Sequence, residues 1–381
     1  MRLIFTLIVI SLLAACAGPK YTVDDGRQVN EELLGHIRSY GLGEKALRPA
    51  IVRSAALQDP ECDTQWELPF SVATSYDASE DDRVAWVRGL GVDERLTVVG
   101  TSPDSPFQPG DKIQKIGAFD ITNTDKMLLL LEKLRDGGFP FDIQLSTNKT
   151  VKVVPFKVCR GYTRLAPPNS PKTQDYHWLV IVQPLEVARA NLSDDEALWV
   201  VLWAQGLSEE SGARMKTYHY GTGVIGTLFT LASGIKSATL GSGAEINLAK
   251  SAATSVVTGV IRKQLIGQAT TVAQKPTQQQ VRSAMQLAAA NRASLSGIAW
   301  AASTVFEKAD AWAYARLEDL DANPLAGFTL HQKLLEQGST SNSMIFDLKR
   351  LKALNKIAEE QGMGEEVVTI LRGVKPEDLQ F

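Results

Sequence analysis

The sequence predicts an α+β protein of several domains, in which a β-rich part precedes a mainly helical part. In residues 83–158, short apolar runs are separated by turns and by one helical stretch, which is typical of a small β-rich domain. In residues 174–381 the apolar residues instead recur mostly at helical spacing. The intervening residues 159–173 contain three prolines, which favours an extended linker.

The composition excludes several classes of protein. The chain has 381 residues, of which 44% are hydrophobic, so it can bury a core and is not disordered over most of its length. Lysine and arginine number 40 against 43 aspartates and glutamates, which leaves a net charge of -3 and no basic field to hold nucleic acid. A mean hydropathy of -0.08 is too low for a protein with several membrane spans.

The first residues have the pattern of an export signal. A positive start at Met1-Arg2 is followed by an apolar run, Leu3 to Leu13, and then by small residues. This run is too short to span a bilayer, which needs about 20 residues. Residues 1–15 are therefore predicted to be a signal peptide.

The end of this signal carries a further motif. Leu13-Ala14-Ala15-Cys16 resembles the bacterial lipobox, which implies cleavage before Cys16 and lipidation of its thiol. The following Ala17-Gly18 lacks the aspartate that marks retention in the inner membrane, so the resemblance implies a lipid anchor in the outer membrane, facing the periplasm. The alternative is an ordinary signal peptide in which the cysteine stands by chance.

Residues 16–82 are expected to form a polar tether followed by a region of helix and strand. Apolar residues at helical spacing predict a helix over 27–40, ended by Gly41. Two cysteines remain after cleavage, Cys62 and Cys159, and an even number in an oxidising compartment favours a disulfide. The bond would close a long loop, worth ~4–5 kcal/mol by chain entropy. The alternative is a pair of buried free thiols.

The β-rich part carries a family phrase. Its predicted elements are strand, turn, strand, helix and hairpin. The predicted turn, Gln108–Asp111, lies within the segment Ser105–Ile113, which has the sequence SPFQPGDKI. This segment resembles the phrase of bacterial PDZ domains in which Ala-Gly-Leu precedes Gly-Asp-x-Ile. Phe107 takes the place of the leucine, and Pro106 departs from the family's glycine.

A PDZ-like domain would bind extended peptide C-termini by adding a strand to a sheet edge, while backbone N–H groups of a glycine-containing loop hold the carboxylate. The best candidate for that loop is Arg88-Gly89-Leu90-Gly91. The alternative is that the domain is only a structural spacer.

A second family phrase opens the helical part. Leu192-Ser193-Asp194-Asp195-Glu196 predicts a helix start, since Ser193 and Glu196 can form a capping box. The phrase resembles gluzincin zinc metallopeptidases of the CAAX-prenyl-protease and HtpX type, where it leads into H-E-x-x-H on the same helix. At those five positions this sequence has Trp203, Ala204, Gln205, Gly206 and Leu207.

Two further elements of that family follow in order. In its E-x-x-A-D motif, Phe306 stands where the third zinc ligand belongs, ahead of Ala309-Asp310. The T-H-P element occurs as Thr340-Ser341-Asn342, without its histidine and upstream of Arg350. The resemblance implies a metallopeptidase frame that has lost its ligands and base, because the replacing side chains offer zinc no donor. The space of the site would be filled by Trp203, Leu207 and Phe306.

Together these features predict a PDZ-like β-rich domain followed by a mainly α-helical, gluzincin-metallopeptidase-like domain, with no metal and no cofactor. The chain is expected to be a non-catalytic envelope lipoprotein that binds protein or peptide segments as a scaffold or adaptor. One alternative is a periplasmic zinc metalloendopeptidase with displaced ligands, in which His219, Glu209 or Glu210, and Glu307 converge. Another is a purely structural lipoprotein, and a third is that the helical part is an all-α domain unrelated to peptidases.

Overall fold

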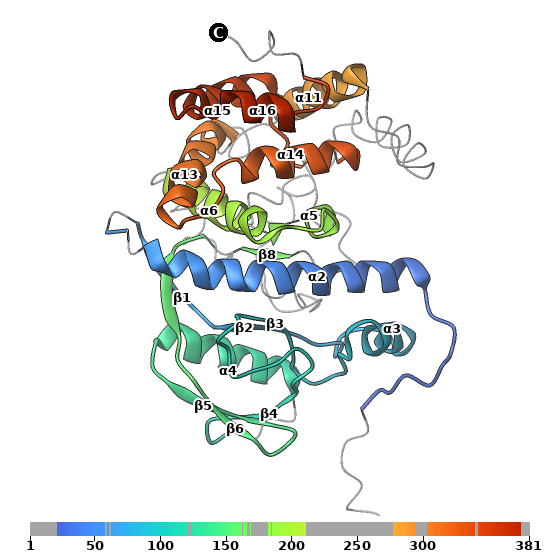
Figure 1. Ribbon diagram of the computed structural model, residues 1–381. Coiled ribbons are helices and arrows are strands. Elements are labelled where there is room, and N and C mark those ends of the chain that lie inside the picture. Colours follow the sequence, from blue (N-terminus) through green and yellow to red (C-terminus); the bar gives the residue numbers. More distant parts are fainter. Residues whose placement is uncertain are drawn as a thin grey trace, which may run out of the picture.

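A computed structural model describes residues 21–374 of the chain, except 58, 61, 120–122, 162, 166–167, 169–181, 184, 211–276, 294–302 and 340–341. The molecule is layered about one long helix, α2 (Glu31–Ser54), with a β-rich part on one side and a helical part on the other (Figure 1). The predicted order of a β-rich part followed by a helical part is thereby confirmed. None of the helices in the described ranges is both long enough and apolar enough to cross a membrane.

Helix α2 begins inside the predicted range but runs past the predicted stop. Asn30 caps its start, because its side chain accepts a hydrogen bond from the Leu33 N–H. The prediction that Gly41 ends the helix is wrong. A Cβ at Gly41 would lie 2.3 Å from Leu90 Cδ2, so the glycine serves a close contact between two helices and not a helix end.

Among the described residues, the β-rich part has three small antiparallel sheets, with strand orders β1-β7, β2-β3 and β4-β5-β6. Two of its strands, β1 and β2, come before residue 83, yet they pair with β7 and β3. The sheets therefore take in chain from before the predicted boundary. The elements are β1 (Thr64–Glu67), β2 (Phe70–Ala73), α3 (Glu80–Leu90), β3 (Thr97–Thr101), β4 (Ile113–Ile116), α4 (Thr124–Gly137), β5 (Phe141–Leu145), β6 (Thr150–Val153) and β7 (Phe156–Cys159).

The segment that carries the PDZ-like phrase joins β3 to β4. Phe107 is buried with its ring 4.4 Å from that of Phe70, between centroids. Gly110 has a φ of 96°, a conformation that glycine adopts without strain, and its N–H donates to the Val98 carbonyl. The phrase therefore supplies one core side chain and the turn that brings two strands together.

The helical part begins with the predicted capping box. The Ser193 N–H donates to Glu196 Oε2 at 2.8 Å, and the Glu196 N–H donates to Ser193 Oγ at 3.2 Å. These reciprocal bonds satisfy donors that a helix start leaves without partners, so the helix begins at this point. The elements of this part are α5 (Leu185–Arg189), α6 (Asp194–Glu210), α11 (Gln278–Ala293), α13 (Phe306–Asp319), α14 (Ala326–Glu336), α15 (Leu348–Glu360) and α16 (Gly364–Ile370).

The described residues of the predicted linker are packed against the body. Cys159 is the last residue of β7, and Leu165 lies in the short strand β8 (Arg164–Leu165), which pairs in parallel with β9 (Val182–Gln183). A Cβ at Gly43 of α2 would lie 2.3 Å from Leu165 Cδ1. At these residues the chain contacts α2 and is not a free spacer.

The buried apolar side chains form two clusters. The smaller cluster lies within the β-rich part and includes Phe70, Phe107 and the inward side chains of α4. The larger cluster extends from α2 through α5, α6 and α13 to α16. Because α2 belongs to the larger cluster and also packs on the β-rich part, the two parts are held against each other by apolar contact.

Glu132, on α4, provides a pH-dependent contribution to stability. Burial raises the pKa of its carboxyl to about 7, against the opposing effect of Arg135 and Arg164. A folded pKa above the ordinary value of 4.5 stabilises the fold while the group is protonated, and this stability is lost as the pH rises toward 7. We expect Glu132→Gln to raise the free energy of unfolding by about 1–3 kcal/mol above pH 7 and to change little at pH 4. Urea titrations between pH 4 and pH 8 measure this difference. The same pH dependence of the free energy of unfolding in the unmodified protein and in Glu132→Gln would contradict the raised pKa of Glu132.

Candidate functional site

The positions that the resemblance assigns to metal ligands come together between α6 and α13. Trp203 and Phe306 meet edge to face, with ring centroids 5.2 Å apart. Both side chains are at most 1% exposed. Ala204 and Leu207, at the positions of the general base and the second histidine, are also buried. Apolar side chains thus occupy the positions to which the resemblance assigns the zinc ligands and the general base.

A buried ion pair lies beside these rings. Asp310 follows Phe306 by one turn of α13, and its carboxylate accepts two hydrogen bonds from Arg350 of α15, Nε to Oδ2 at 2.7 Å and Nη2 to Oδ1 at 2.6 Å. The Trp203 indole N–H also donates to Asp310 Oδ1, at 2.8 Å. The remaining guanidinium nitrogen, Nη1 of Arg350, donates to the Ser343 carbonyl at 2.7 Å. Trp203, Asp310 and Arg350 therefore form one hydrogen-bonded unit across three segments of the chain.

The two charges of this unit are buried and compensate each other. The Asp310 and Arg350 side chains are 2% and 3% exposed, so each charge depends on the other for its compensation. The Arg350 guanidinium also lies 5.0 Å from the ring centroids of Phe306 and Phe346, within the range of cation–π attraction. Its charge is thus met by one carboxylate and two ring faces.

His331, on α14, lies close to the same unit. Its Nδ1 accepts a hydrogen bond from the Phe346 N–H at 3.0 Å, and its ring stacks on that of Phe346. Burial, together with the positive charges of Arg350 and Arg292, lowers the pKa of His331 to about 3. The imidazole is therefore neutral at physiological pH, with its proton on Nε2, because Nδ1 serves as an acceptor. Nothing in the spacing of the four histidines predicts this core position.

The described residues offer no metal site. Among them, no three side chains of histidine, cysteine, aspartate or glutamate lie close enough together to hold a metal ion. Two carboxylates of the displaced-ligand alternative have other partners: Glu209 accepts from the Asp63 N–H at 3.1 Å, and Glu307 forms an ion pair with Lys349. His219 and the Glu210 side chain lie outside the described residues.

The prediction that residues 88–91 form a loop is wrong. Arg88, Gly89 and Leu90 form the last turn of α3, and Gly91 caps it with a φ of 69°. A Cβ at Gly89 would lie 2.7 Å from Ile37 Cγ2, so this glycine allows α3 to approach α2. The two glycines that suggested a loop serve a helix contact and a helix end.

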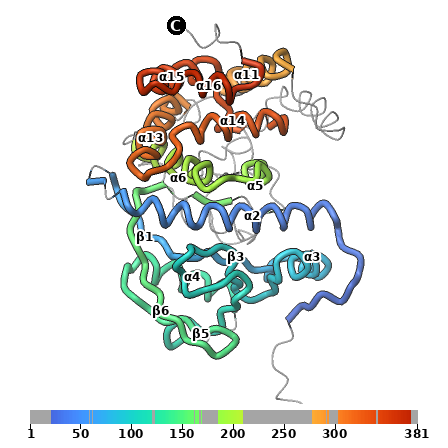
Figure 2. Tube along the Cα trace, in the orientation of Figure 1, coloured from blue at the N-terminus to red at the C-terminus, as the bar shows by residue number. Residues whose placement is uncertain are grey.

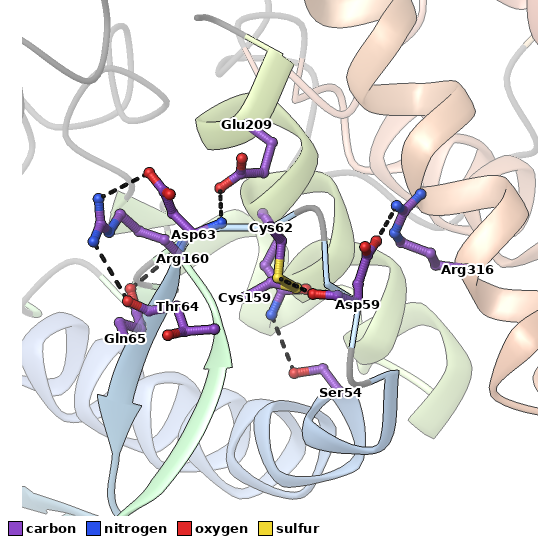
Figure 3. The surroundings of a disulfide bond; sticks show 12 residues. Ser54, Asp59, Cys62, Asp63, Thr64, Gln65, Cys159, Arg160, Glu209 and Arg316 are labelled. Carbon is purple, nitrogen blue, oxygen red and sulfur yellow. Dashed lines mark hydrogen bonds and ion pairs between the residues drawn. A yellow bond between two sulfur atoms is a disulfide. The ribbon is translucent and has the colours of Figure 1, made fainter. Parts of the chain in front are cut away.

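Cys62 and Cys159 are joined by a disulfide bond (Figure 3). The bond ties the chain after the short 3-10 helix η1 (Ala55–Leu57) to the end of β7, where Thr64 and Cys159 are paired in the sheet. Its surroundings reach the helical part, since Asp59 forms an ion pair with Arg316 of α13. The disulfide therefore lies where the β-rich part meets the helical part. Cys16, the predicted lipidation site, lies outside the described residues.

No protein-family model, no curated protein and no solved structure matches this chain. Function is therefore inferred from the chemistry of the described residues. At the ligand positions that chemistry consists of apolar packing and one internally compensated ion pair, an arrangement suited to holding helices together.

Proposed function

We propose that the chain is a non-catalytic envelope lipoprotein, anchored in the outer membrane through Cys16 and facing the periplasm. It binds protein or peptide segments as a scaffold or adaptor. Its β-rich part is PDZ-like, and its helical part retains the frame of a gluzincin metallopeptidase without the catalytic side chains.

The observation that carries this proposal is the hydrogen bond from Trp203 to Asp310. A metal-binding histidine donates its second N–H to a carboxylate or carbonyl, which orients the ring toward the metal. Trp203 stands at the first histidine position and makes such a bond, but an indole nitrogen is a donor only and has no lone pair for zinc. Phe306 packs on Trp203, so these two positions stabilise the fold and provide no zinc ligand.

A sheet edge offers a place for a bound peptide. β6 is one of the two outer strands of the three-stranded sheet in the described part of the chain. Two exposed apolar residues flank this sheet: Phe139 lies two residues before β5 and is 79% exposed, and Val154 directly follows β6 and is 57% exposed. An outer strand with an exposed apolar residue at its end suits the addition of an extended chain, in which backbone bonds supply affinity.

Metal analysis and peptide binding test the two halves of the proposal. The purified full-length protein is expected to hold zinc well below one ion per chain, and any hydrolysis of unfolded protein should be insensitive to chelators. Stoichiometric zinc with chelator-sensitive cleavage would instead establish an active peptidase.

For binding, a library of C-terminal peptides would be screened by fluorescence anisotropy. Phe139→Asp with Val154→Asp should weaken capture by about tenfold or more, since this corresponds to about 1.4 kcal/mol of binding free energy. Lys152→Glu, within β6 and outside these two apolar positions, is the control. An absence of binding by the unmodified chain would favour a purely structural lipoprotein.

A further inference from the structure

The tether between the predicted lipid anchor and α2 is attached to the body. Residues 21–30, here called the docked tether, run from the start of α2 along α3 (Figure 2). The Thr22 hydroxyl donates to Glu94 Oε1 at 2.6 Å, and its N–H donates to Glu94 Oε2 at 2.9 Å. Further along, Arg88 donates two hydrogen bonds to Asp24. The first described residue, Tyr21, lies with its ring 4.0 Å from the Arg95 guanidinium carbon.

The contacts continue to the other end of the docked tether. Arg27 forms an ion pair with Asp81 in the first turn of α3, and its carbonyl accepts a hydrogen bond from Arg88. Each exposed ion pair alone contributes little to stability. Together, the contacts hold the docked tether at several points along its length. A segment whose composition predicts a free leash is therefore held on α3 and on the residues before β3.

The distance from Cys16 to the docked tether is short. Four residues lie between Cys16 and Tyr21, and five fully extended residue steps span at most about 18 Å. If the tether were released, the free chain would extend to Glu31 and could reach about 50 Å. With a lipid on Cys16, as proposed above, docking would hold one end of the molecule near the lipid headgroups.

The docked tether leaves the molecule beside the β-rich part, and the C-terminal helices lie at the opposite end (Figures 1 and 2). Its first residues include two apolar side chains, Tyr21 and Val23, which are 37% and 68% exposed. A tyrosine beside an arginine and an exposed aliphatic group suit the boundary between headgroups and acyl chains, where aromatic side chains concentrate. The partner that fits this end of the molecule is a lipid surface.

We infer that the docked tether orients the protein on the membrane, with α3 and the tether-bearing end of the β-rich part against the headgroups and the helical part pointing away. This inference rests on the proposed lipidation of Cys16. It assigns a membrane-contacting surface to the residues around Tyr21 and Arg95. The helical part would then face partners in the periplasm.

Energy transfer from the protein to labelled lipids tests the orientation. The full-length lipidated protein would be reconstituted in phosphatidylethanolamine–phosphatidylglycerol vesicles that carry an acceptor on the headgroups. A donor amino acid would replace either Glu80, on α3, or Glu366, on α16, since these two helices lie on either side of α2 (Figure 1). High transfer from position 80 and low transfer from position 366 is the expected result. Equal transfer from both positions would overturn the inference.

Variants of the tether test whether its contacts with the body, and not the lipid anchor alone, set the orientation. Thr22→Val with Arg88→Ala removes tether contacts and should bring the transfer from the two positions closer together. Arg38→Ala, an exposed charge removal on α2 away from the docked tether, should leave the difference unchanged. A Gly-Ser insertion between Lys20 and Tyr21 preserves the fold and should reduce transfer from position 80, because the body moves outward. Unchanged transfer in both the released and the lengthened chain would overturn the inference.

Mass spectrometry of the N-terminal peptide distinguishes a failure of the proposed orientation from a failure of the proposed lipid anchor. A lipid-bearing Cys16 combined with equal transfer from the two positions contradicts only the orientation. A Cys16 without lipid contradicts the anchor itself and the orientation with it.

Discussion

Replacing Asp310 with alanine is expected to lower the free energy of unfolding by about 3–5 kcal/mol. The change leaves the guanidinium of Arg350 buried without its carboxylate and removes the acceptor of the Trp203 indole N–H. An unpaired buried charge and an unpaired buried donor both destabilise a fold. Urea unfolding of the full chain, followed by circular dichroism, measures the difference.

A control on the same helix shows whether burial is the cause. Glu307 pairs with Lys349, whose side chain is 81% exposed, so Glu307→Ala should cost less than about 1 kcal/mol. Asp310→Leu combined with Arg350→Met removes both buried charges and should recover part of the loss. Equal destabilisation by Asp310→Ala and Glu307→Ala would contradict the buried ion pair as the source of stability.

Removing the disulfide is expected to have an effect of similar size. Cys62 and Cys159 are separated by 97 residues along the chain. Cross-linking a loop of that length restricts the unfolded chain enough to stabilise the fold by about 4–5 kcal/mol. Cys62→Ala with Cys159→Ala should therefore lower the urea midpoint strongly. Alanine is preferred at 159 because that side chain is buried and a serine hydroxyl there would need a partner.

Reductant separates the covalent link from the packing of the two sulfurs. The unmodified chain should lose stability when dithiothreitol is added, whereas the double variant should be insensitive to it. Cys16→Ser, which leaves the Cys62–Cys159 bond intact, should respond to dithiothreitol as the unmodified chain does. A midpoint that reductant leaves unchanged in the unmodified chain would show that the bond does not stabilise the protein.

Several local features could be predicted because neighbouring residues determine them. The capping box of Ser193 and Glu196 forms as expected, since both its bonds lie within four residues of chain. The turn before β4 also forms, because Gly110 adopts a positive φ and Phe107 is the apolar residue next to it. Such features depend little on tertiary contacts with distant parts of the chain.

The errors at three glycines share one physical cause. The sequence predicts a helix stop at Gly41 and a loop at Gly89 and Gly91, because glycine permits both. In the structure, Gly41 and Gly89 lie where α2 and α3 pack closely, and only Gly91 ends a helix. A glycine selected for close approach cannot be told from a glycine selected for its φ when only the chain before and after it is known.

By itself, the sequence determined the order of a β-rich and a helical part, and the absence of a zinc donor at Trp203, Leu207 and Phe306. Residue type alone is enough for the second point, since none of these three side chains can bind zinc. Only the tertiary structure decided that Asp310 and Arg350 compensate each other beneath Trp203, and that the tether is held on α3. These contacts join residues far apart in the chain, and their energies depend on burial, which local sequence does not specify.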